Sequence, residues 1–242
     1  MGASMGARKN RSSEAVRPPW TDDDTAIWHT LDILAAMLSG RASARPPLAT
    51  PFPPHLAPGE LILVEGPFLL SSFYATSDGS STQSTMFVAG TGAFGAAAVV
   101  TSLVGSALVN ASREKAARAA ATPAWRPCDS GTVYVSTRGF YLQTNTGLYP
   151  WDWSSVSSAT VVGRSRVNIQ GDSRQDAVSW ILQSPWAELI FTLWAVARHP
   201  THPQIVTGGW LPPGWYEHAK ANGYWPERQI HEITAAVHER RE

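Results

Sequence analysis

A long stretch without any charged side chain is the feature that most constrains how this chain can fold. No ionisable residue lies between Asp78 and Arg113, and almost every residue of 86–109 is apolar or small. A helix of this length would be long enough to cross a hydrocarbon core of about 30 Å. Its small side chains recur at four-residue intervals, at Ala89, Ala93, Ala97, Thr101 and Gly105. Such a ridge permits close approach of a second backbone, so we predict a helix within 84–121 that is covered by protein or lipid.

The sequence leaves open what covers this helix. If 61–74 pairs with later strands, both ends of the uncharged stretch lie on one side of a membrane, which excludes a single crossing. A two-legged hairpin would have about 12 residues per leg, too few for such a core. Small and hydroxylated residues outnumber Leu and Phe in 86–109, so transfer into lipid gains little. Contact with protein, within the chain, in a homo-oligomer or with a partner, is favoured over membrane contact through 86–109, and a loosely packed loop is the third alternative.

Strand signals flank this segment on both sides. Apolar runs at 61–65 and 68–74, separated by Gly66 and Pro67, predict two strands or one bent strand. Turn residues at 137–139, 145–147 and 171–173 break the later β region. Six further candidate strands cover 132–136, 139–144, 151–153, 158–162, 167–169 and 178–182. Together they predict an antiparallel meander.

Helices are predicted at both ends of this β region. Thr21 followed by three aspartates is typical of a helix N-cap, and the apolar spacing behind it predicts a helix over 20–40. Ser184 and Pro185 are expected to begin a second helix, whose apolar stripe covers a sheet and ends at Arg198. The remaining segments are predicted to be a disordered tail (1–19), a proline-rich linker (41–59) and a C-terminal arm with a last helix (201–242).

The order of elements after residue 130 has a further implication. Thr137 and Arg138 lie in a first hairpin, a segment containing Trp and Asp follows at 149–156, and the helix over 186–198 closes the series. This order resembles the GRAM and bacterial pleckstrin-homology-like (PH-like) domain family.

The resemblance implies an α+β domain over 60–200, built as an antiparallel β-barrel or bent sheet that is capped by a helix, with 84–121 as a helical insertion. It also implies binding of lipid, peptide or protein instead of catalysis. The segment 61–78 contains no Lys or Arg, which argues against phosphoinositide binding.

Composition argues against several classes of function. The 19 basic and 19 acidic side chains cancel, so no net field attracts nucleic acid and we expect no nucleic-acid partner. The single cysteine, Cys128, cannot form an internal disulfide. No apolar run follows the basic residues of the first twenty positions, so a cytoplasmic location is predicted, with association to the inner face of the membrane as the alternative.

The sequence shows no recognisable reactive site. His199 and His202 are each followed by proline, which predicts an extended connector instead of a helical pair of ligands. Phosphate-binding loops, nucleophile elbows and zinc-protease motifs are missing from the sequence. We therefore expect no enzyme, no catalytic residue, no cofactor and no metal site, and an enzyme with an unrecognised site remains the alternative.

Aromatic side chains gather in the C-terminal arm. Trp210, Trp215, Tyr216 and Trp225 lie in or near a stretch rich in Pro and Gly, a composition typical of docking segments. The alternative, which we favour, is that these rings cover the sheet of their own chain. The leading expectation is a non-catalytic, PH/GRAM-like scaffold that self-associates or binds a protein partner through the small-residue ridge and this arm.

Overall fold

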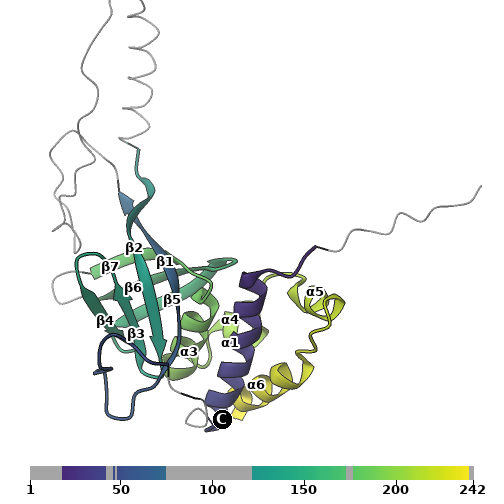
Figure 1. The fold of residues 1–242 in the computed structure, drawn as a ribbon. Helices are drawn as coiled ribbons and strands as arrows, with labels where there is room; N and C mark the ends of the chain where they lie inside the picture. Colours follow the sequence, from purple (N-terminus) through teal and green to yellow (C-terminus); the bar gives the residue numbers. More distant parts are fainter. Residues whose placement is uncertain (1–17, 42–45, 47, 75–121, 173–176, 240–242) are drawn as a thin grey trace, which may run out of the picture.

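The computed structural model describes residues 18–41, 46, 48–74, 122–172 and 177–239. Nearly all of the predicted tail and the whole of the predicted insertion, 84–121, lie outside the described residues. Within the described residues the fold is α+β, with one seven-stranded antiparallel sheet and five helices (Figure 1). The α+β prediction is confirmed.

The seven strands form a single open sheet with the order β4-β3-β2-β1-β7-β6-β5. Their bounds are β1 Ile62–Tyr74, β2 Ala124–Ser136, β3 Gly139–Gln143, β4 Leu148–Asp152, β5 Val156–Gly163, β6 Arg166–Asp172 and β7 Ala177–Gln183. The closed-barrel form is wrong for the described residues, because β4 and β5 are the two edges of the sheet. Between these strands the chain turns, with Ser155 N donating to the Asp152 carbonyl, and does not continue as a ladder.

Strand β1 is one continuous strand over a region where two strands or one bent strand were predicted. The Gly66–Pro67 pair does not break it. Among the described strands this part of β1 pairs only with β2, since β7 joins from Leu69 onward. The missing N–H of a proline is tolerated where a strand is paired on one side. Strand β2 begins at Ala124 and not at the predicted 132. The sequence did not indicate its first half, because that half carries little apolar alternation and pairs only with β1 among the described strands.

The predicted break at 171–173 is wrong for its first two residues. Gly171 and Asp172 belong to β6, and Gly171 lies opposite both Val156 and Val178. A Cβ at position 171 would lie 2.3 Å from the Ser155 carbonyl oxygen, so this glycine serves close strand packing and not a turn.

Glycine is also required where β3 meets β4. A Cβ at Gly139 would lie 1.9 Å from the Trp151 carbonyl oxygen and 2.8 Å from the Asp152 Cα. Because both atoms are backbone, relief requires the strands to separate. We expect Gly139→Ala to lower the free energy of unfolding by about 1–3 kcal/mol, measured by urea denaturation. Gly163→Ala on β5, whose added Cβ meets nothing within 4 Å, is the matched control, and equal losses in the two variants would contradict this account.

The first helix is set by its local sequence. Helix α1, Asp22–Leu38, begins with a capping box in which the Thr21 side chain accepts from Asp24 N and the Asp24 carboxylate accepts from Thr21 N. The predicted N-cap is confirmed. Helix α3, Ala187–Arg198, instead begins after Trp186, so the predicted cap at Ser184 is placed too early.

Three more helices follow, namely α4 Pro203–Thr207, α5 Trp215–Ala221 and α6 Glu227–Glu239. The extended connector predicted at the histidines is wrong in its second half. His202 is the N-cap of α4, and its Nδ1 accepts from Gln204 N at 3.2 Å. A proline at the first helical position fits this role, because its fixed φ is already helical.

One contiguous apolar core joins the sheet to all the described helices. Helix α3 lies against β5 and β6 on one side and α1 on the other, and α1 packs in turn on α6 (Figure 1). Phe191 and Leu189 of α3 are completely buried. Trp210 and Val237, from the segment predicted as an arm, belong to this same core.

A second, smaller cluster shows that part of the predicted linker is packed. Phe52 and Leu56 pack against buried Tyr134 and Tyr141 of the sheet. The Tyr141 hydroxyl accepts from His55 N at 2.9 Å and donates to a Glu60 carboxylate oxygen at 2.7 Å. Thus 52–60 is a docked strap and not a free spacer.

Candidate binding site

The far end of the β1–β2 pair is a two-stranded ribbon that extends beyond the rest of the sheet (Figure 1). Strand β7 pairs with β1 only as far as Ser72, and β3 pairs with β2 only from Thr132 onward. Beyond these points β1 and β2 pair only with each other among the described strands, down to Tyr74 opposite Ala124. We call residues 73–74 and 124–126 the ribbon end.

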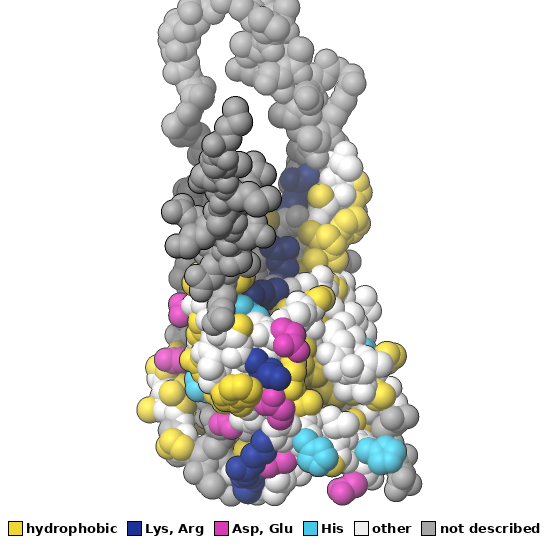
Figure 2. Space-filling view, turned by 90° about the vertical axis from the view of Figure 1, so that its right-hand side faces the viewer, with side chains coloured by type: hydrophobic (Ala, Val, Ile, Leu, Met, Phe, Trp, Pro, Cys, Tyr) yellow, Lys and Arg dark blue, Asp and Glu magenta, His cyan; other side chains and the backbone are white. Residues whose placement is uncertain are grey.

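The ribbon end carries an exposed aromatic pair. Phe73 and Trp125 lie directly opposite each other, with ring centroids 5.5 Å apart. Their exposed fractions are 55% and 39%, large for side chains of this size. Leu69 is also exposed, and the two-residue repeat of a strand places it on the same face of β1 as Phe73. Figure 2 shows hydrophobic side chains gathered at this upper end of the described part, with basic side chains beside them.

This ribbon end is also where the uncharged segment leaves and rejoins the described part of the chain. Residues 75–121 connect Tyr74 to Thr122, and Tyr74 lies opposite Ala124. In the sequence analysis, a single membrane crossing by the uncharged stretch was excluded if 61–74 pairs with a later strand. The structure shows this pairing, between β1 and β2. The two flanks of the segment lie side by side. Among the helices that the structure describes, none combines the length and the apolar composition that a bilayer crossing requires.

The predicted interaction residues fall into two groups. Ala89, Ala93, Ala97, Thr101 and Gly105 lie outside the described residues. Trp210 and Trp215 are 3% and 2% exposed and belong to the core, so neither ring is open to a docking partner in this structure. The Trp215 ring lies 6.0 Å from that of Trp20, at the start of α1. These two rings pack among the helices of their own chain. The sequence had favoured a different arrangement, in which they cover the sheet.

Tyr216 and Trp225 have more accessible positions. Trp225 is 62% exposed and Tyr216 is half-buried. Lys220 Nζ lies 5.2 Å from the Tyr216 ring centroid and 5.7 Å from that of Trp225, while the Tyr216 hydroxyl donates to Glu227 at 2.8 Å. Both rings are thus already engaged by a cation of their own chain. Trp225 remains the one predicted aromatic anchor with a largely open ring among the described residues.

A polar cluster that sequence reasoning missed joins α1 to the β5–β6 turn and α5. Asp24, completely buried, lies 2.6 Å from Arg164 Nη2 through one carboxylate oxygen and 3.3 Å from His218 Nε2 through the other. Burial alone would raise the pKa of Asp24, but hydrogen bonds from Thr21 and the charge of Arg164 lower it below its ordinary value. This carboxylate is therefore ionised and serves as an anchor between distant segments.

Glu188 is the second buried acid of this region. Its side chain is completely buried on α3 and accepts from Ser165 N at 2.8 Å, while its other carboxylate oxygen has no hydrogen-bond partner among the described residues. Burial, together with the charge of nearby Asp23, raises the pKa of Glu188 to about 7, although the bond from Ser165 N and the charge of Arg164 oppose the shift. Glu188 thus changes protonation near neutral pH inside the core.

The arrangement of the other reactive groups does not favour nucleophilic or metal chemistry. The Cys128 thiol donates to the Leu70 carbonyl at 3.4 Å, and desolvation together with the neighbouring Asp129 raises its pKa to about 11. A thiol with this pKa stays protonated at pH 7 and is a poor nucleophile. In the part of the chain that the structure describes, no three His, Cys, Asp or Glu side chains are grouped as a metal site would require.

Comparison of the chain with protein-family models, curated proteins and solved structures gives no match. What the protein does is therefore inferred from its own residues and their geometry.

Proposed function

We propose that this protein is a non-catalytic, PH/GRAM-like binding module that associates with protein, in the first place a second copy of itself. The contact is made through the ribbon end and the uncharged stretch 79–112, which lies in the connection between β1 and β2. The observation that carries the proposal is the exposed Phe73–Trp125 pair at the point where the uncharged segment leaves and rejoins the sheet. Aromatic side chains are enriched at protein interfaces, where they bury large areas at little entropic cost.

The PH/GRAM-like part of the proposal is supported by topology. The strand order places β4 and β5, which follow one another in the chain, at opposite edges of a single antiparallel sheet. The resemblance implied a bent sheet with a closing helix, and α3 follows the last strand and packs on β5 and β6. A fold of this kind positions its loops and its strand ends for binding.

The non-catalytic part of the proposal is supported by how two aspartates, Asp24 and Asp152, are used. Asp24 caps a helix and pairs with Arg164, and Asp152 accepts from the backbone N–H groups of Ser154 and Ser155 in a turn. In each case the charge is matched by a fixed structural partner. Such pairing ties segments together and leaves the carboxylate unsuited to proton transfer with a substrate.

Disruption of the aromatic pair is the direct test of association. In the double variant Phe73→Ser/Trp125→Ser we expect the assembly to dissociate at concentrations where the parent is associated, because the buried apolar area at the interface is lost. Mass is measured by light scattering after size-exclusion chromatography over a hundredfold range of concentration. Val162→Ser is the matched control, since Val162 is 52% exposed on β5, at one edge of the sheet. A parent that is monomeric throughout, or a double variant that assembles as the parent does, would contradict self-association.

A second candidate function is contact with a membrane surface through the same ribbon end. It is favoured by the combination of an exposed Trp, an exposed Phe and Arg126 beside an apolar connection, because Trp and basic residues are enriched where proteins enter the membrane interface. Flotation with vesicles of neutral and of anionic lipid separates the two functions. Co-flotation of the parent and not of the double variant would favour the membrane, whereas an assembled parent that does not float favours protein contact.

A further inference from the structure

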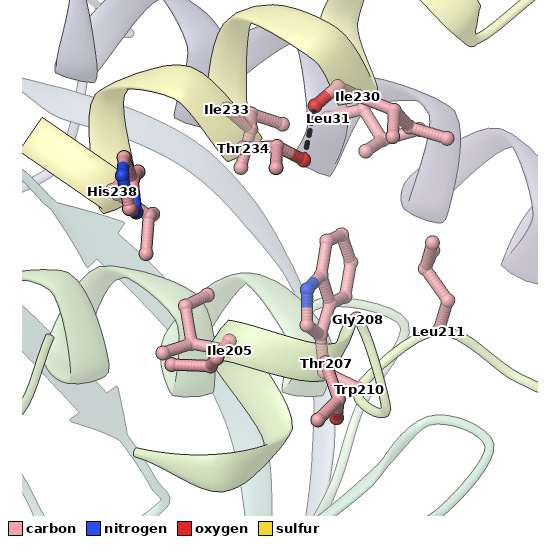
Figure 3. Close-up of a pocket in the computed structure, with 12 residues that line it drawn as sticks. Leu31, Ile205, Thr207, Gly208, Trp210, Leu211, Ile230, Ile233, Thr234 and His238 are labelled. Carbon is pink, nitrogen blue, oxygen red and sulfur yellow. Dashed lines mark hydrogen bonds between the residues drawn. The ribbon is translucent and has the colours of Figure 1, made fainter. Parts of the chain in front are cut away.

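A cleft is lined by residues of α1, α4 and α6 (Figure 3). Figure 1 shows that these helices lie away from the ribbon end. Its volume is about 340 Å³. This value is at the lower end of the roughly 300–1,000 Å³ that is typical of small-molecule sites. Its walls are mostly apolar, formed by Leu31 of α1, Ile205 of α4, Trp210 and Leu211 of the following loop, and Ile233 and Val237 of α6.

One polar group opens into this cleft without a partner in the described part of the protein. Trp210 is only 3% exposed, and its indole N–H makes no hydrogen bond with any described residue. In Figure 3 its nitrogen faces the open space between Ile205 and Ile233. An indole N–H can only donate, so in the empty cleft this donor is left to solvent, and a ligand that displaces the solvent must supply an acceptor.

Other tryptophans of this chain show the usual pattern. The indole N–H groups of Trp20, Trp153, Trp186 and Trp194 each donate to an oxygen of the protein, at 2.7 to 3.4 Å. The Trp215 N–H also has no partner among the described residues, but Trp215 does not line this cleft. The Trp210 N–H differs from all of these in that it points into a cleft. A ligand oxygen placed there would satisfy it.

The lining also limits the charge of the ligand. Among the residues that the structure describes, no Asp, Glu, Lys or Arg lines the cleft, and His238 is the single titratable residue that does. A charged group would lose its hydration in this cleft without gaining an opposite charge. An uncharged ligand has no such cost.

We propose that this cleft binds a small, uncharged, largely apolar molecule with one hydrogen-bond acceptor, such as a ketone, ester or alcohol oxygen, which accepts from Trp210 Nε1. A helix of a partner protein fits less well. Its carbonyl oxygens are already bonded within the helix, so its apolar face would leave the Trp210 donor unpaired.

The test uses a neutral fluorescent ketone, 6-propionyl-2-(dimethylamino)naphthalene, titrated with the full-length protein. We expect saturable, one-to-one binding with a blue shift of the emission. Trp210→Phe keeps an aromatic ring and removes the N–H, so it should weaken binding about threefold to tenfold. Trp225→Phe, which removes an exposed indole outside the cleft, should bind as the parent does.

A second pair of variants tests the location without disturbing the core. Thr234 lines the cleft from an exposed position on α6, and Ala235 is exposed on the same helix but does not line it. Thr234→Trp should weaken binding at least tenfold because the new ring fills the cleft, whereas Ala235→Trp should leave it unchanged. Octan-1-ol should displace the fluorophore, and octanoate at pH 8 should do so far less well. Absence of saturable binding, equal affinity of Trp210→Phe and parent, or equal affinity of Thr234→Trp and parent would each overturn the proposal.

Discussion

Trp215→Ala should be the most damaging of the single substitutions considered for this protein. Trp215 is 2% exposed and packs in the contiguous core, next to Trp20 at the start of α1. Truncation of a buried aromatic residue to alanine removes its transfer free energy and leaves a cavity, which together cost about 3–5 kcal/mol. We expect a loss of this size in the free energy of unfolding, measured by urea denaturation.

The control for this substitution is Trp225→Ala, which removes an indole that is 62% exposed. Its expected effect is within about 0.5 kcal/mol, as for most surface positions. The comparison decides whether the C-terminal segment stabilises the fold. If Trp215→Ala were as stable as the parent but failed to bind a partner, the ring would be a docking anchor after all.

Glu188→Gln is expected to make stability less dependent on pH. The carboxyl of Glu188 has an ordinary pKa of 4.5 and a folded-state pKa of about 7. A raised pKa means that the folded state binds the proton more tightly than the unfolded state does. The resulting stabilisation is fully present below pH 4.5, declines between pH 4.5 and 7, and is lost above pH 7. The full change is on the order of 3 kcal/mol.

The amide that replaces this carboxyl stays neutral at every pH and can keep the bond from Ser165 N. The variant should therefore gain stability relative to the parent as the pH rises from 5 to 8, when both are unfolded with urea at each pH. Asp23 and Arg164 face the same group and must be left unchanged. Glu217→Gln, on the exposed side of α5, is the matched control. A difference between Glu188→Gln and parent that is the same at pH 5 and pH 8 would show that Glu188 does not titrate in this range.

Elements whose signals are local were predicted well. Thr21 and Asp24 form the capping box that their three-residue spacing indicates, because both partners lie within one helical turn. Strands with clear apolar runs, such as β3 and β7, were placed within a residue or two. The missed first half of β2 contains Pro127 and Cys128. Its one neighbour among the described strands is β1, about fifty residues earlier in the chain.

The candidate sites were harder to predict because they too are formed by residues that lie far apart in the sequence. Aromatic residues on both flanks of the uncharged segment were a visible signal for the ribbon end, but only the pairing of Phe73 with Trp125 brings them together. Nothing in the sequence indicates that Asp24 meets Arg164, 140 positions further along the chain, or that Trp210 closes one side of a cleft. Contacts of this kind follow from the packing of whole elements.

The sequence by itself determined the α+β class, the position of most strands and helices, and the uncharged segment between β1 and β2, because periodicity, capping and composition act over a few residues. The tertiary structure alone decided that the sheet is open, that Trp210 and Trp215 are buried, that Glu188 is held in the core, and that both flanks of the uncharged segment lie at one ribbon end. These outcomes depend on which surfaces meet. Burial and proximity between distant segments are properties of the whole packed chain, and no local pattern encodes them.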